Sequence, residues 1–87
     1  MTATLFIKNE KKEVEVYRFN TTNPKFSQYN GDICVARKLQ NNTAFIKLLA
    51  NDVTLTTGPI VGVVYSDGLS SKKIITESGS VYELVKL

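Results

Sequence analysis

Short runs rich in Val, Ile and Thr, separated by turn-forming residues, limit most strongly what this chain can fold into. These three residue types supply 24 of its 87 residues, and their branched side chains suit the pleated surface of a strand. The pattern is clearest near the end of the chain, where Ser66-Asp67-Gly68 and Ser78-Gly79 separate three strand-like runs. Asp67-Gly68 is a tight-turn signal because both residues tolerate a positive φ. The pattern predicts a three-stranded antiparallel meander over Ile60–Tyr65, Lys72–Glu77 and Ser80–Leu87.

Further strand-like runs precede this meander, and we predict strands over Thr2–Lys8, Glu13–Asn20, Ile33–Leu39, Thr43–Leu49 and Val53–Thr56. The first two runs form a predicted hairpin across the polar turn Asn9–Lys12, with a bulge near Tyr17 that moves Tyr17 or Phe19 inward. A short helix over 43–50 is the alternative for the fourth run, because good helix formers follow a potential cap at Asn42. Strands joined mainly by short turns favour an all-β fold, a small curled antiparallel sheet or barrel of SH3-like or OB-like type with about six or seven strands.

One long polar segment interrupts the strands between Asn20 and Asp32. It is dense in turn-forming residues and reads as a loop, and loops of this length in compact domains are often functional. Its aromatic residues Phe26 and Tyr29 have two interpretations, which are packing over the open end of a barrel or contact with a ligand.

Composition argues against an enzyme and against a metal or cofactor site. The chain has 87 residues, no His and the single cysteine Cys34, so it fits one domain, 1–87, without an internal disulfide, a Cys/His zinc site or the commonest general base. Cys34 lies in an apolar run and is expected to be a small buried core residue. The lone thiol, the absence of a signal-like start and the lack of a membrane-span-length apolar run together predict a cytoplasmic location with no membrane partner.

Candidate contacts to a ligand or partner come from the remaining polar and aromatic residues. The net charge of +3 permits an anionic partner, and arginine is the better anchor for phosphate or carboxylate. Hydroxyl groups at predicted strand ends add polar donors, although ordinary turn chemistry explains them as well. The candidates are Arg18, Tyr29, Arg37, Lys38, Thr57, Ser78, Ser80 and Tyr82.

The last third of the chain resembles a group of small uncharacterised phage and bacterial proteins. The resemblance is carried by Thr-Gly-Pro-Ile-Val at 57–61 and by Ile-Thr-Glu-Ser-Gly-Ser-Val-Tyr-Glu-Leu at 75–84. Those proteins show Thr-Ser-Pro-Val, a short hairpin and then Thr-x-Asn-Ser-x-Tyr-x-Leu, whereas this chain has Gly58 in place of Ser and Ser78-Gly79 near the position of Asn. The resemblance implies a phage accessory protein, a group that includes inhibitors of host enzymes, blockers of defence systems and sponges for signalling nucleotides.

Three functions follow as hypotheses. The first is a non-enzymatic phage-type inhibitor or anti-defence protein that sequesters or occludes a host protein or a small anionic ligand such as a nucleotide. A homo-oligomer in which two protomers share a pocket is one form of this hypothesis. The second is a module that binds RNA or single-stranded DNA, with aromatic residues including Tyr65 stacking on bases. The third is a structural phage component.

Overall fold

Nine strands and one short 3₁₀ helix make up the described part of the chain, which is residues 2–7 and 10–87, with side chains described from residue 14 onward. In this computed structural model the elements are β1 (Thr2–Ile7), β2 (Glu10–Glu15), β3 (Tyr17–Thr21), η1 (Ser27–Tyr29), β4 (Ile33–Lys38), β5 (Ala44–Leu48), β6 (Val53–Thr56), β7 (Ile60–Ser66), β8 (Ser71–Thr76) and β9 (Val81–Lys86). The all-β prediction is confirmed, and the alternative of a helix over 43–50 is wrong because β5 occupies that segment.

The predicted first hairpin is present but its details differ. The predicted strand end Lys8 and the first predicted turn residue Asn9 lie outside the described residues. The prediction of a turn over the remaining residues 10–12 is wrong, because β2 begins at Glu10. The single strand predicted over Glu13–Asn20 is divided at Val16 into β2, which pairs with β1, and β3, which enters a larger sheet. This division replaces the predicted bulge, and it leaves Phe19 fully buried as expected.

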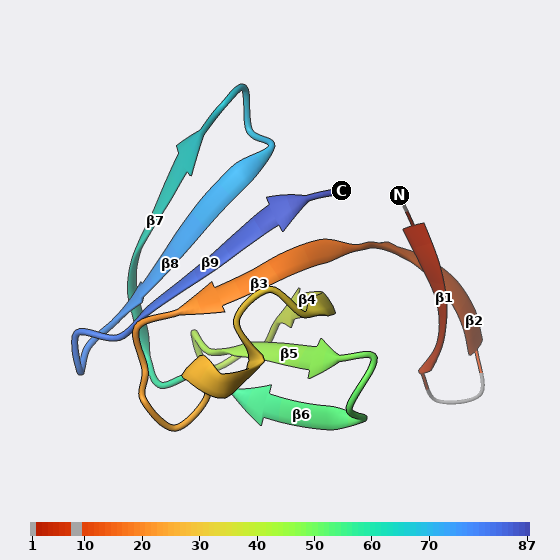
Figure 1. Ribbon diagram of the computed structural model, residues 1–87, viewed down its shortest axis with the longest axis horizontal. Helices are drawn as coiled ribbons and strands as arrows, with labels where there is room; N and C mark the ends of the chain where they lie inside the picture. The colour runs from red at the N-terminus through yellow and green to blue at the C-terminus, as the bar shows by residue number, and fades with distance from the viewer. Residues whose placement is uncertain (1, 8–9) are drawn as a thin grey trace.

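Seven strands form one antiparallel sheet in the order β6-β5-β4-β3-β9-β8-β7. The sheet curls without closing, because its two edge strands β6 and β7 follow each other in the chain but do not pair. Figure 1 shows β7, β8 and β9 splayed to one side and β4, β5 and β6 to the other, with β3 beside β9 as the link between the two groups. The predicted final meander is confirmed by the pairing of β7 with β8 and of β8 with β9.

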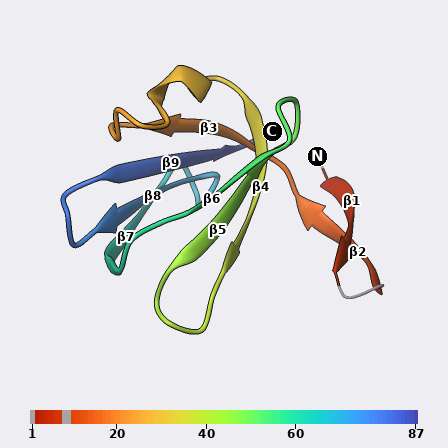
Figure 2. The ribbon, with the colours of Figure 1, turned by 90° about the horizontal axis from the view of Figure 1, so that it is seen from below.

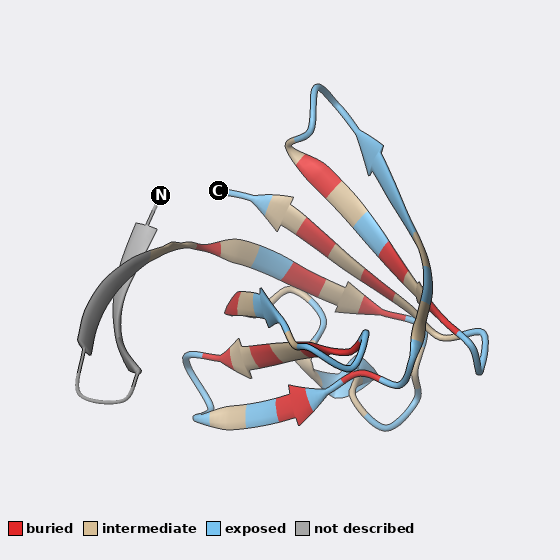
Figure 3. Ribbon diagram, turned by 180° about the vertical axis from the view of Figure 1, so that it is seen from behind, coloured by how far each residue is buried: buried red, intermediate tan, exposed pale blue. Residues whose placement is uncertain are grey.

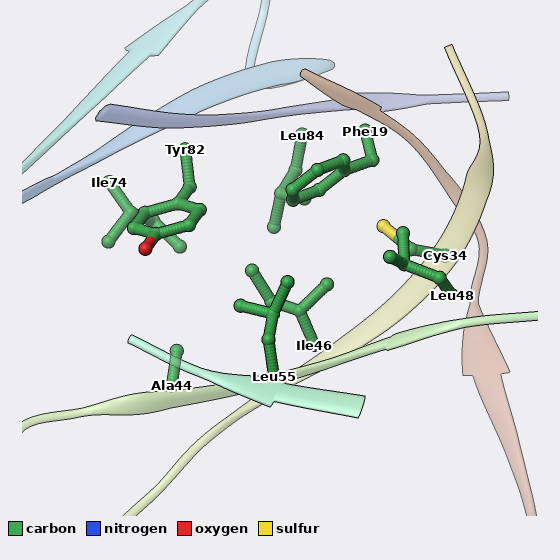
Figure 4. Packing of buried hydrophobic residues seen from close by; sticks show 9 residues of the cluster. All are labelled: Phe19, Cys34, Ala44, Ile46, Leu48, Leu55, Ile74, Tyr82 and Leu84. Atoms are coloured by element: carbon green, nitrogen blue, oxygen red, sulfur yellow. The ribbon is translucent and has the colours of Figure 1, made fainter. Parts of the chain in front are cut away.

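A hydrophobic cluster fills the concave side of the curled sheet (Figure 4). Its members are Phe19, Cys34, Ala44, Ile46, Leu48, Leu55, Ile74, Tyr82 and Leu84. They lie at alternate positions of their strands, as expected when one face of a sheet is buried. Burial of Cys34, which the sequence predicted, is confirmed. On the opposite face of β4, Val35 is also buried, in the region where β2 approaches β4.

The loop after β3 packs over the core as a cap. Phe26 and Tyr29 are partly buried against the hydrophobic cluster, so the packing interpretation of these aromatics is the one that the structure supports. In Figure 2 the segment that carries η1 runs alongside β3. The carboxamide of Asn30 fixes it there, since its Oδ1 accepts a hydrogen bond from the backbone N–H of Thr21 at 2.8 Å.

Candidate functional site

The incomplete closure of the sheet leaves a groove between its two halves. We name it the β4–β7 groove, and its volume is about 490 Å³. Its walls are Ala36–Lys38 on β4, Asn42 and Ala44 from the β4–β5 hairpin, Ile60–Val63 and Tyr65 on β7, and Lys72 and Ile74 on β8. Because β4 and β7 are distant in sequence, only the curl of the sheet brings these residues together.

The groove begins where β7 meets the β4–β5 hairpin. The backbone N–H of Ile60 donates to the carbonyl oxygen of Asn42 at 2.8 Å, and the side-chain amide of Asn42 donates to the carbonyl oxygen of Ile60. Asn42 therefore pairs with the start of β7 much as a neighbouring strand would. Beyond this point β7 has no strand partner other than β8 among the described elements, so the groove is closed at the Asn42 end and open toward Tyr65.

Three cationic side chains line the groove, and none of the described residues that line it is acidic. Lys38 lies opposite Ala44 and Lys72 lies opposite Leu84 in their ladders. Since directly opposed residues share a face of a sheet, both lysines are on the concave face at the margin of the core. Arg37, the third cationic residue, lies opposite Phe45 and so starts on the other face of β4, and it lines the groove from the exposed end of that strand.

Lys72 also connects the groove with an aromatic residue. Its ammonium group lies 5.0 Å from the centre of the Tyr17 ring, within the range of a cation–π interaction. Burial raises the pKa of the Tyr17 hydroxyl, and the positive charge of Lys86 opposes that increase. The phenol is therefore neutral near neutral pH, and it adds no negative charge at this end of the groove.

The positive charge of Lys72 acts on the pKa of the Cys34 thiol, but the burial of Cys34 makes the thiol unreactive. Burial raises the pKa of the thiol to about 12, with Lys72 acting in the opposite direction. The reactive species of cysteine is the thiolate, which is scarce at neutral pH when the pKa is this high. Cys34 thus acts as a core side chain and supplies no nucleophile to the groove.

The structure brings two of the eight candidate residues, Arg37 and Lys38, into the groove. Arg18 is not beside them. It lies opposite Ile33, four positions before Arg37 along β4, which is about 13 Å at a rise of ~3.3 Å per residue. Its guanidinium group donates to the carbonyl oxygen of Gly31 at 2.7 Å, so the structure does not bring the two arginines together in this groove.

Intramolecular contacts involve three further candidates, which are Tyr29, Thr57 and Tyr82. Tyr29 packs against the core, while Tyr82 is 2 % exposed and its hydroxyl accepts a hydrogen bond from the side chain of Asn23 at 3.0 Å. The hydroxyl of buried Thr57 accepts from the backbone N–H of Ala44 at 2.9 Å. These residues were predicted as ligand contacts because sequence does not show which aromatic and hydroxyl groups are used internally.

Ser78 and Ser80 lie in the turn between β8 and β9, away from the groove. The Ser78 hydroxyl lies 3.1 Å from the hydroxyl of Thr76, and the carbonyl oxygen of Ser80 accepts from the backbone N–H of Thr76 at 2.9 Å. These contacts lie within the turn, in agreement with the alternative interpretation of the two serines as ordinary turn residues.

Sequence reasoning did not assign Lys72 or Asn42 to the site. Lys72 was predicted only as the first residue of a strand. The alternation of β8 contained the missing signal, because Lys72 lies two positions before the buried Ile74 and so shares its face. No comparable signal marks Asn42, since its role depends on where β7 begins.

Comparison with known proteins finds no matching family model, no similar curated protein and no similar solved structure. Among residues 2–7 and 10–87, there is no cluster of three or more His, Cys, Asp or Glu side chains that could hold a metal ion. The described chain also contains no helix with the length and apolar character needed to span a bilayer.

Proposed function

We propose that this protein acts by binding an anionic partner in the β4–β7 groove, without catalysing a reaction. The observation that carries the proposal is the placement of Arg37, Lys38 and Lys72 around one groove in which no described lining residue is acidic. Apolar side chains from β7 and β8 form the rest of the wall, and such a mixture of a few charges on an apolar surface is typical of a binding site.

The arrangement of potential reactive groups supports binding over catalysis. Cationic side chains hold and orient an anion, but general acid–base or covalent chemistry needs a group with a suitably shifted pKa at the site. The buried Cys34 thiol is shifted in the direction that suppresses its reactivity.

Sequestration or occlusion of a host protein or a small anionic ligand by a phage-type inhibitor or anti-defence protein remains our proposal for the biological role. It rests on the resemblance of the last third of the chain, and the cationic groove is compatible with either target. The cytoplasmic location is part of the same proposal. Binding of nucleic acid is the second candidate, favoured by the exposed ring of Tyr65 beside Lys72, which could stack on a base.

The experiment compares two double variants of equal charge loss. Arg37→Gln with Lys38→Gln removes groove cations, and Lys25→Gln with Lys73→Gln removes exposed lysines outside the groove. Each is titrated with nucleoside triphosphates, a single-stranded oligonucleotide and polyglutamate. Since hydrogen bonds to charged groups contribute about 1.5–3 kcal/mol, the groove variant should bind at least one probe about tenfold or more weakly than the wild type.

Two results would contradict the proposal. One is failure of the wild-type protein to bind any of the anionic probes. The other is an equal loss of binding in both double variants, which would show that only the overall charge matters. A steep decrease in oligonucleotide affinity with salt, without binding of the other probes, would favour the nucleic-acid alternative.

A further inference from the structure

Strand β7 is an open sheet edge with an apolar, uncharged sequence. It is the last strand in the sheet order, and residues 60–66 read Ile-Val-Gly-Val-Val-Tyr-Ser. Val61, Val63, Val64 and Tyr65 are 65 %, 42 %, 53 % and 55 % exposed, and Figure 3 shows most of the strand as exposed, with partly buried residues only near its start. Natural proteins usually protect such edges with charges, prolines, bulges or short strands.

The protection that β7 does have is confined to its start. Pro59 precedes the strand, a register shift lies between Ile60 and Gly62, and Asn42 occupies the backbone groups of Ile60. None of these devices reaches residues 63–66. The unprotected segment is therefore the part of β7 that borders the open end of the β4–β7 groove.

The backbone groups of this segment can be oriented from the ladder. The backbone N–H of Thr76 donates to the carbonyl oxygen of Ser80. The N–H and C=O groups of β8 residues that alternate with Thr76, such as Ile74, therefore point toward β9, and those of Lys73 point toward β7. Lys73 lies opposite Val64. By the same alternation, the N–H and C=O groups of Val63 and Tyr65 point away from β8, toward the open edge.

We propose that β7 accepts an extended acidic segment of a partner protein as an added strand. Such β-augmentation obtains affinity from backbone hydrogen bonds and specificity from alternate side chains. Val63 and Tyr65 would supply the backbone groups. Every second side chain of the added strand lies on the concave face, next to Lys38 and Lys72 in the groove. Complementarity to these cations selects Glu or Asp at those alternate positions, so this inference rests on the proposed function and names its partner class.

A second copy of this chain is the competing occupant, because an uncharged strand can also pair with itself. Charge favours the acidic segment. Each copy has a net charge of +3 and would bring its own cationic groove to the same edge, which adds repulsion between the two copies. An acidic strand meets the same cations with the opposite sign.

The test uses four synthetic eight-residue peptides that alternate Glu or Gln with Val. The first is Glu-Val, and the second replaces every Glu by Gln. The third and fourth are the Glu-Val peptide N-methylated on the amides of one edge or of the other edge. Affinity for the full chain is measured by fluorescence anisotropy. We expect binding of the Glu-Val peptide, about tenfold or greater loss with Gln, and a similar loss for one of the two methylated versions.

A protein variant probes the same edge from the other side. Val63→Pro removes an N–H that points to the open edge, where proline is tolerated in a strand, and it should weaken the Glu-Val peptide while Val63→Thr should not. If Val63→Pro does not fold, the methylated peptides decide the matter alone because they leave the protein unchanged.

Each outcome has a distinct meaning. Tight binding that both methylated peptides retain overturns strand addition and leaves the proposed anion site intact. Failure of the Glu-Val peptide together with all the anionic probes overturns both proposals. A wild-type dimer in analytical ultracentrifugation that Val63→Pro dissociates shows that a second copy occupies the edge, and it overturns the inference.

Discussion

Replacing Thr57 by Val tests whether its hydroxyl group serves the fold. Thr57 is 3 % exposed, its hydroxyl accepts from the backbone N–H of Ala44 at 2.9 Å, and its own N–H donates to the carbonyl oxygen of Ala44 at 2.8 Å. Valine preserves the shape but leaves the Ala44 N–H without its acceptor, which costs about 1–3 kcal/mol for a buried group. The melting temperature should therefore decrease by roughly 5–20 °C, since 1 kcal/mol corresponds to about 4–8 °C in a domain of this size.

The assay is urea and thermal unfolding followed by circular dichroism. Thr56→Val is the matched control, because Thr56 is exposed on the neighbouring position of β6, and it should change the free energy of unfolding by less than about 0.5 kcal/mol. Thr57→Ser retains the hydroxyl and should lie much closer to the wild type than Thr57→Val does. Equal stability of Thr57→Val and Thr56→Val would refute the reasoning, and loss of anion binding in a folded Thr57→Val protein would restore Thr57 as a binding residue.

Three further changes address the core and the capping loop. The pKa of Cys34 is raised from 9.0 to about 12, so the contribution of the thiol to the free energy of unfolding is complete below about pH 9 and declines by about 1.4 kcal/mol per pH unit above it. In urea midpoints measured at rising pH, Cys34→Ala should lack this decline. Parallel pH curves for the wild type and Cys34→Ala would contradict the assignment. Asn30→Ala removes the acceptor of the Thr21 N–H and should cost about 0.5–1.5 kcal/mol, with faster hydrogen exchange at that amide, whereas Asn30→Asp should preserve its protection. Tyr82→Phe removes the acceptor of the Asn23 amide and should destabilise by a similar amount, about 0.5–1.5 kcal/mol, without altering anion binding; a groove role for this residue predicts the reverse.

Local sequence signals predicted the strands of the last third well. Asp67 and Gly68 both have positive φ in the structure, as the turn signal required, and β7, β8 and β9 begin and end within a residue of their predicted bounds. The strand over Ala44–Leu48 also agrees, because its buried and partly buried residues alternate strictly. These elements depend on turn chemistry and on period-two patterning, which a sequence displays directly.

The division at Val16 and the location of the groove could not be obtained in this way. Val16 is buried at the junction where the chain leaves one ladder and enters another, and apolar patterning looks the same on either side of such a change. Arg37 and Lys72 line one groove because the sheet curls without closing, a property of the whole strand order. Sequence could not show that Arg18 and Tyr82 have intramolecular partners, because long-range pairing sets those partners.

The position of β9 beside β3 has a consequence for how the chain acquires its structure. Strands β3 to β6 pair in chain order, and so do β7 to β9, whereas Tyr17 pairs with Lys86 across almost the whole sequence. The entropy lost in closing a loop rises with its length, and topologies that depend on such distant pairs fold slowly. The strands β3 to β6 and the strands β7 to β9 can each pair through local hairpins. The pairing of β3 with β9 is therefore expected to be the late step that sets the folding rate and joins the two walls of the groove.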